Sequence, residues 1–275
     1  MNLPRLRSDA EYDRAVELAR MSGVPLSRCP TCGSNPEKVR VAYADGTAEA
    51  EGREYGTYKY MGEVYECDCE TQIQLRKHYL LAGIGEQYMR LDWADYRNDA
   101  VKRDVELYLG KWDAIRRNGM GIEFGGEALG VGKTFAATYV AKELIKKGVQ
   151  VLFVPFLEFL STVIRDDDES RERMERMRRV TVLVVDELRP PRTERQAWFG
   201  DRFEELVRHR TNFNLPIITT TNLTEDELRT HYPRVYSLMS AKHIRLDLTG
   251  QDARMSWIAA QNLDLVLNDE VRPIT

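Results

Sequence analysis

The chain has 275 residues, of which 43% are hydrophobic and 31% are charged, an ordinary balance for a globular protein of one large or two modest domains. Its net charge of −4 excludes a global positive field as the means of holding nucleic acid, so any such binding needs a local basic patch. Residues 1–13 contain no apolar signal-peptide core, and the most apolar stretch, residues 151–160, is interrupted by Pro155 and Glu158. These features predict a cytoplasmic protein without a membrane span.

The first predicted element is an amphipathic helix over residues 9–21. Its apolar side chains recur at nearly helical spacing, and Gly23 is a plausible stop. The pattern is compatible with packing on the domain that follows and with docking of a partner.

All four cysteines lie before residue 70, as Cys29-Pro-Thr-Cys32 and Cys67-Asp-Cys69. Two closely spaced pairs in a cytoplasmic chain favour a metal site over disulfides. A closed tetrahedral zinc site takes four cysteines in such pairs. We therefore predict zinc bound by Cys29, Cys32, Cys67 and Cys69, with buried or redox-active cysteines as the alternative.

Two strands, residues 39–43 and 57–65, are predicted between the cysteine pairs. A zinc ion there would be structural, because a segment of under about a hundred residues buries little core of its own. The candidate replacement ligand is His78, within the helix predicted from about residue 70 to Gly83.

The domain boundary is placed close to residue 90. Residues 1–90 are predicted to form an N-terminal zinc-binding, partner-docking domain, and residues 91–275 an ATPase domain. Residues 91–96 are expected to be an extended connector, and residues 99–118 a single amphipathic helix.

A glycine-rich stretch, residues 125–134, lies between a short apolar strand and a helical pattern, which is the layout of a phosphate-binding loop. Its nucleotide-binding residues are Gly130, Val131, Gly132, Lys133 and Thr134. The usual first glycine would stand at position 127, where this chain has Glu127, so the loop departs from the pattern unless Gly126 takes that role in a loop one residue longer. A glycine turn that merely ends a buried strand is the alternative.

Strands and helices alternate from about residue 120 to 222. Strands are predicted at 121–124, 149–154, 180–185 and 215–221, and helices at 135–147, 156–164, 193–211 and 225–231. The run at 180–185 is continuously apolar and largely β-branched, typical of a strand buried on both faces of a parallel sheet. The fold class is therefore α/β, with functional side chains at the carboxyl ends of the strands.

Polar side chains follow two of these strands. Lys133 would meet the β- and γ-phosphates of ATP, and Thr134 and Asp186 would hold Mg²⁺. Glu187 is the natural general base for the attacking water, and Asn222 ends the next strand, where its amide could sit between water and γ-phosphate. Each could also be an ordinary solvated strand end.

These residues resemble the AAA+ helicase loaders and transposition ATPases of the DnaC/IstB type, in particular the zinc-bearing bacterial and phage loaders. The likeness covers most of the chain and rests on the order of its motifs. These are the two cysteine pairs, residues 82–84 and 91–93, the phosphate-binding loop, Asp186-Glu187, Thr221-Asn222-Leu223 and residues 250–254.

The resemblance implies a P-loop AAA+ core with ATP, Mg²⁺ and Zn²⁺ as cofactors, and weak hydrolysis stimulated by DNA or assembly. It implies a role in DNA replication, loading or remodelling a replicative hexameric helicase on single-stranded DNA, and contact between the zinc domain and that helicase. It further implies that Asn222 is the sensor residue and that the chain self-assembles on ATP. Only 27 residues follow Leu248, in agreement with loaders that lack a full helical lid.

One departure concerns the arginine that reaches a neighbouring subunit's nucleotide. Similar proteins tend to carry it at the position of Leu238, so Arg234 is the substitute candidate. Arg254 could face the nucleotide or form a surface ion pair.

Two other functions share the core. One is a transposition helper ATPase of the IstB type, which delivers a transposase to duplex DNA, and the other is a nucleotide-binding adaptor with little hydrolysis.

The charged residues 165–179 are expected to form a self-paired, solvated helix, with Glu175 and Arg179 at i,i+4 spacing. The alternative is that Arg176, Arg178 and Arg179 contact single-stranded DNA in an oligomer's pore.

Overall fold

The structure, a computed structural model, describes residues 9–35, 56–165, 167–190, 194–250, 263 and 265–275. Its contacts divide the chain into two units, one of residues Trp93–Asp252 and one of Leu3–Asp92 with Ala253–Thr275. None of the helices within the described ranges is long and apolar enough to cross a membrane.

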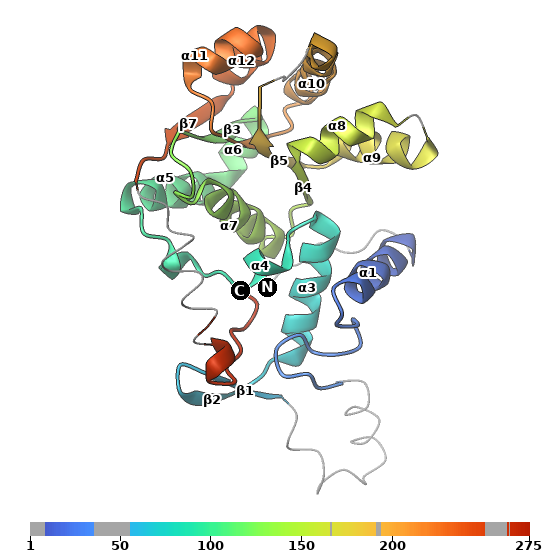
Figure 1. The fold of residues 1–275 in the computed structure, drawn as a ribbon, viewed down its shortest axis with the longest axis vertical. Coiled ribbons are helices and arrows are strands. Elements are labelled where there is room, and N and C mark those ends of the chain that lie inside the picture. Colours follow the sequence, from blue (N-terminus) through green and yellow to red (C-terminus); the bar gives the residue numbers. More distant parts are fainter. Residues whose placement is uncertain (1–8, 36–55, 166, 191–193, 251–262, 264) are drawn as a thin grey trace, which may run out of the picture. The chain divides into compact units, whose positions relative to one another are not determined.

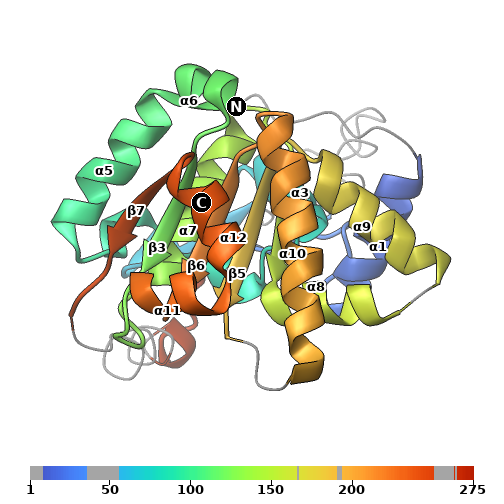
Figure 2. The same ribbon diagram turned by 90° about the horizontal axis from the view of Figure 1, so that it is seen from above.

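The first unit is built on a five-stranded sheet in the order β4-β5-β6-β3-β7, in which all neighbours are parallel. The strands are β3 Gly121–Gly125, β4 Val151–Pro155, β5 Val182–Leu188, β6 Ile217–Thr221 and β7 His243–Asp247. The predicted α/β fold with a parallel sheet is confirmed. Because β6 lies between β5 and β3, their carboxyl ends meet at one edge of the sheet (Figure 2).

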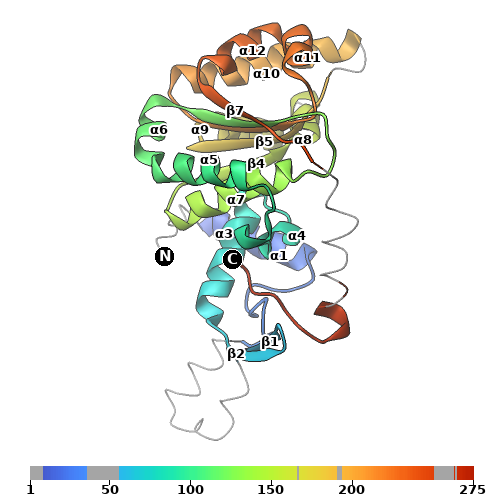
Figure 3. The same cartoon turned by 90° about the vertical axis from the view of Figure 1, so that its left-hand side faces the viewer.

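Helices cover both faces of this sheet. The helices are α5 Asp99–Gly110, α6 Trp112–Asn118, α7 Lys133–Lys146, α8 Phe156–Ile164, α9 Asp168–Arg179, α10 Glu194–Asn212, α11 Glu225–His231 and α12 Pro233–Ser240. Figure 3 shows α5 and α7 on one face and α10, α11 and α12 over the other. The β5 side chains alternate between the faces, and Leu183 and Val185 join a core with Phe203 of α10 and Phe156 of α8.

The predicted single helix over residues 99–118 is wrong, because two helices occupy it. The break falls at Lys111, which caps the end of α5 and precedes α6, directly after Gly110. Glycine costs about 1 kcal/mol in a helix interior relative to alanine, which favours the break there.

The sequence prediction also missed α12 and β7. Strand β7 has the sequence His-Ile-Arg-Leu-Asp and is only partly buried at the edge of the sheet, so no continuous apolar run marks it. Strand β5 extends to Leu188, beyond its predicted end at residue 185, with a bulge in its pairing to β6 between Val185 and Leu188.

The second unit contains α1 Asp9–Met21, α3 Cys69–Ala82, the short helix α4 Glu86–Met89 and a hairpin (Figure 1). Helices α1 and α3 match their predictions and share a small apolar core. The single strand predicted over residues 57–65 is wrong: β1 Thr57–Tyr60 and β2 Glu63–Glu66 form an antiparallel pair. Met61 and Gly62 turn between them with φ of 52° and 80°, as a two-residue hairpin loop requires. The strand predicted at 39–43 lies outside the described residues.

The C-terminal residues are part of this second unit, in contrast to the predicted ATPase domain of residues 91–275. Glu270 accepts hydrogen bonds from the amides of Met61 and Gly62 at 2.9 and 2.8 Å. The buried Gln72 side chain donates to the Ile274 carbonyl at 3.0 Å and accepts from the Ile274 amide at 2.7 Å. The Tyr79 hydroxyl donates to the Thr275 carbonyl at 2.8 Å. Residues 270–275 therefore complete the N-terminal unit.

Replacing Gln72 with alanine should release this C-terminal segment. The change leaves the buried amide and carbonyl of Ile274 without partners, at a cost of about 1–3 kcal/mol for each unsatisfied group. Hydrogen–deuterium exchange should accelerate in residues 270–275 of Gln72→Ala and remain unchanged in Gln74→Ala, a partly buried neighbour on the same helix. Equal protection in both variants would contradict the assignment.

Candidate nucleotide and zinc sites

The glycine-rich loop joins β3 to α7. Gly126 has a φ of 113°, and a Cβ there would lie 2.5 Å from the Leu248 carbonyl oxygen, so only glycine fits. Glu127 is exposed, and its φ is not positive. The strain that would follow from forcing Glu127 into a glycine conformation is therefore absent, and Gly126 takes the first-glycine role in a longer loop. Gly132, with a φ of 91°, is the N-cap of α7.

Lys133 is the first residue of α7 and is buried. Its Nζ donates to the carbonyl oxygens of Gly126 and Ala128, both at 2.6 Å. The ammonium thus lies inside the loop, beside the amides of the helix N-terminus that favour a phosphate.

Asp186 is the centre of the hydrogen bonds at this edge. The hydroxyls of Thr134, on α7, and Thr220, on β6, donate to its Oδ1 at 3.0 and 2.6 Å. Burial raises the pKa of the Asp186 carboxyl above its ordinary value, and these two hydrogen bonds oppose the increase. The predicted residues Thr134 and Asp186 are therefore in direct contact. Thr220 was missed, although it stands in a run of three threonines at a strand end.

Glu187 has a φ of 58°, a conformation that a residue other than glycine rarely adopts. Its amide donates to the Thr220 hydroxyl at 2.8 Å, and the bulge of β5 lies at the same point. Its half-exposed carboxylate forms an ion pair with Arg189. Strain of this kind costs of order 1–3 kcal/mol and is concentrated at functional sites.

Asn222 is exposed and follows β6 directly, between the loop strand β3 and the acidic strand β5. Hydrogen bonds hold Thr221 and Leu223, the residues on either side of Asn222, in position. The Thr221 hydroxyl accepts from the Leu223 amide at 3.0 Å and donates to the Leu188 carbonyl at 2.9 Å. Arg245 of β7 donates to the Leu223 carbonyl at 3.0 Å and forms an ion pair with the buried Glu123.

Arg234 does not join this group. Its side chain is exposed on α12, and its Nη1 atom lies 3.5 Å from Oε2 of Glu204 on α10. Leu238, at the position where similar proteins carry arginine, is partly buried against the core. Arg254 lies outside the described residues.

An aromatic stack beside the loop was also missed. A Cβ on Gly132 would lie 2.7 Å from the Tyr96 ring. Tyr96 stacks on Trp93 with ring centroids 4.7 Å apart, and Trp93 stacks on Tyr139 at 4.0 Å. Residues 93–95 form a short 3-10 helix rather than a purely extended connector. The Trp93 ring stacks on Phe135 and Tyr139, in the first two turns of α7.

The four cysteines converge as predicted, with all four sulfurs within 4.8 Å of one another. The Sγ atoms of Cys29 and Cys67 are 3.6 Å apart, and those of Cys32 and Cys69 are 3.4 Å apart. Tetrahedral zinc with Zn–S bonds of about 2.3 Å separates its sulfurs by about 3.8 Å, so the cluster fits this ion. His78 is not part of it.

The pKa values of the cysteine thiols also bear on a zinc site. Burial raises the pKa of the Cys69 thiol to about 12 and raises that of Cys67 as well. At Cys32, the effect of burial is outweighed by hydrogen bonds, chiefly with Ser34, which lower the pKa to about 6. The thiols of Cys67 and Cys69 resist ionisation, and a dication supplies the compensating charge that thiolate ligands need. Burial lowers the pKa of His78 to about 4, so this ring is neutral within α3.

Arginines of the charged helix α9 have carboxylate partners both within the helix and on neighbouring helices. The ion pair between Glu175 and Arg179 is formed, as expected, and Arg178 pairs with Glu205 of α10. These two arginines therefore already have carboxylate partners.

A parallel sheet with this strand order, a phosphate-binding loop after β3 and an acidic pair at the end of β5 define a P-loop protein of the AAA+ type. The chain belongs to the family of IstB-like ATP binding proteins, whose family model matches residues 41–233. The predicted family is confirmed, and membership identifies the chain as an ATP-binding protein.

Two Bacillus subtilis (strain 168) proteins are similar to the chain. The uncharacterized protein YqaM is 25% identical over 177 residues, which cover 59% of this chain and 56% of YqaM. The replicative helicase loader DnaI is 24% identical over 182 residues, which cover 62% of this chain and 57% of DnaI. The chain thus spans little more than half the length of these relatives.

Solved structures share the fold. The crystal structure of DnaI matches with a TM-score of 0.52 and 21% identity, covering 60% of this chain and 94% of that one. The DnaC helicase loader matches with a TM-score of 0.50 and 19% identity, covering 60% and 100%. Domain III of Thermotoga maritima DnaA matches with a TM-score of 0.51 and 14% identity, covering 66% and 76%.

We expect one zinc ion per chain. Cys69→Ser should lose most of it, because a structural site needs all four ligands, whereas His78→Gln should retain it. Zinc content of the purified protein by atomic absorption, together with unfolding in the presence of a chelator, measures this. Full zinc content in Cys69→Ser would show that the cysteines are not the ligands.

Proposed function

We propose that this chain is an ATP-dependent loader or remodeller of a replicative helicase on single-stranded DNA. The observation that carries the ATPase part is the contact between Thr134 and Asp186 beside the buried Lys133. The similarity to the replicative helicase loader DnaI supports the loader part. The zinc unit is the proposed contact with the helicase.

In this proposal Lys133 exchanges its two loop carbonyls for the β- and γ-phosphate oxygens of ATP. Thr134 and Asp186 hold Mg²⁺, since a hydroxyl and a carboxylate oxygen suit this ion. When bound, Mg²⁺ neutralises charge that develops on the phosphate oxygens.

Glu187 is the proposed general base, and Asn222 the sensor of the γ-phosphate. The Glu187 carboxylate must leave Arg189 before it can orient water, so hydrolysis by the free chain is expected to be slow and stimulated by DNA or assembly. Arg234 would act on a neighbouring subunit after breaking its exposed ion pair with Glu204.

Two variants should separate nucleotide binding from hydrolysis. Lys133→Ala should lose ATP binding, because it removes the charge that faces the phosphates. Glu187→Gln should keep the affinity for ATP and lose about 10²- to 10⁴-fold in kcat, the usual contribution of a general base. Titration with a fluorescent ATP analogue and steady-state ATPase assays with and without single-stranded DNA measure both. A parent protein with no turnover under any condition would favour the non-hydrolysing adaptor.

Membership of the IstB-like family favours a second function, a transposition helper that delivers a transposase to duplex DNA. The discriminating experiment is a pull-down with the tagged full chain against the replicative helicase and the transposase of the same source. Retention of the helicase, reduced by Cys69→Ser, is expected for a loader. Retention of the transposase alone would overturn the loader proposal.

A further inference from the structure

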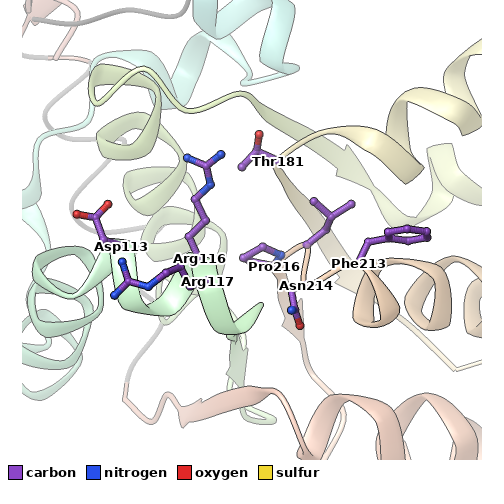
Figure 4. Close-up of a pocket in the computed structure, with 8 residues that line it drawn as sticks. Asp113, Arg116, Arg117, Thr181, Phe213, Asn214 and Pro216 are labelled. Carbon is purple, nitrogen blue, oxygen red and sulfur yellow. The ribbon is translucent and has the colours of Figure 1, made fainter.

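A cavity of about 580 Å³ lies at the amino-terminal edge of the sheet in the ATPase unit (Figure 4). Its lining includes Thr181 and Pro216, the residues that precede β5 and β6, and side chains from the end of α6. The phosphate-binding loop follows the opposite end of β3. A five-residue strand is about 16 Å long, so the cavity is separate from the nucleotide site.

The walls of this cavity are held by buried hydrogen bonds. The guanidinium of Arg210, which is fully buried, donates to the carbonyls of Val180, Thr181 and Pro216 at 2.9, 3.2 and 2.8 Å. Lys242 Nζ donates to the Asn214 side-chain oxygen at 3.2 Å. The loops around the cavity are therefore fixed in position before any ligand arrives.

Two adjacent arginines in the last turn of α6, Arg116 and Arg117, line the cavity, and their side chains point in different directions (Figure 4). Neither has an ion-pair partner among the residues that the structure describes, although Asp113 of the same helix also lines the cavity. The exposed arginines 202 and 208 of α10, by contrast, are each paired with a glutamate. Two unpaired guanidinium groups offer planar, bidentate donors that suit phosphate.

An aromatic side chain lies on the other side of the cavity. Phe213, at the turn between α10 and β6, is 65% exposed, and its ring contacts His209 with centroids 4.8 Å apart. Thr181 and Asn214 also line the cavity and add neutral polar groups, and the Asn214 side-chain oxygen accepts from Lys242. A phosphate-binding pair beside an exposed aromatic ring is the combination that binds single-stranded nucleic acid, through the backbone and through base stacking.

We propose that this cavity binds a segment of single-stranded DNA, with backbone phosphates on Arg116 and Arg117 and a base stacked on Phe213. The site differs from the end of α9, where Arg178 and Arg179 already have carboxylate partners. It does not depend on a helicase partner, and DNA bound there leaves the phosphate-binding loop free.

Binding of a fluorescein-labelled oligothymidine to the full chain, followed by anisotropy over a range of salt concentrations, tests the proposal. Exchanging both arginines, in Arg116→Gln with Arg117→Gln, should weaken binding about tenfold and reduce the slope of log K against log salt by about 1.4, because two single-strand phosphate contacts are lost. Phe213→Ala should weaken binding about fivefold or more with little change in slope. Asp113→Asn should strengthen it, since a negative charge leaves the cavity.

The matched control is Arg202→Gln with Arg208→Gln, which removes the same charge from exposed, already paired positions and should change affinity less than about twofold. ATP binding by the variants is measured separately and should equal that of the parent, so a failure here is distinct from a failure of the ATPase proposal. Unchanged affinity and slope in the Arg116/Arg117 variant would overturn the site. Competition by thymidine monophosphate or inorganic phosphate as effective as that of the strand would equally overturn it, because the cavity would then take an isolated phosphate.

Discussion

The buried carboxylate of Asp186 joins the three elements on which the nucleotide site is built. It stands near the end of β5 and accepts hydrogen bonds from Thr134 at the start of α7 and from Thr220 on β6. Hydrogen bonds to a charged acceptor contribute about 1.5–3 kcal/mol each. These bonds offset the cost of burying the carboxylate and hold the strand ends against the glycine-rich loop.

The same group of bonds explains why Glu187 has an unusual backbone. Thr220 donates to Asp186 and accepts from the amide of Glu187, so one hydroxyl links the carboxylate of one residue to the backbone of the next. The chain leaves the regular ladder there, and the Glu187 side chain is directed to the surface, where Arg189 meets it. The acidic pair is thus divided into one buried and one accessible carboxylate.

Much of the ATPase unit could be predicted from sequence because its central strands are continuous apolar runs and its loop carries Gly-x-Gly-Lys-Thr. Convergence of the four cysteines was predictable for a similar reason, since their paired spacing is specific. The edge strand β7 was not, because it has no continuous apolar run and its alternation of polar and apolar residues extends over only five positions. Thr220 and Arg189 were missed because their roles depend on register and on a bulge, which only the folded sheet defines.

The return of residues 270–275 to the N-terminal unit makes that unit discontinuous in sequence. Its helices and cysteine pairs are synthesised first, then the whole ATPase unit, and only afterwards the segment that Gln72, Tyr79 and the amides of Met61 and Gly62 hold in place. Domains generally fold as units during synthesis, the N-terminal one first. Residues 270–275 follow the ATPase unit in the sequence, so the hydrogen bonds that Gln72 and Tyr79 make with them form only after the ATPase unit has been synthesised.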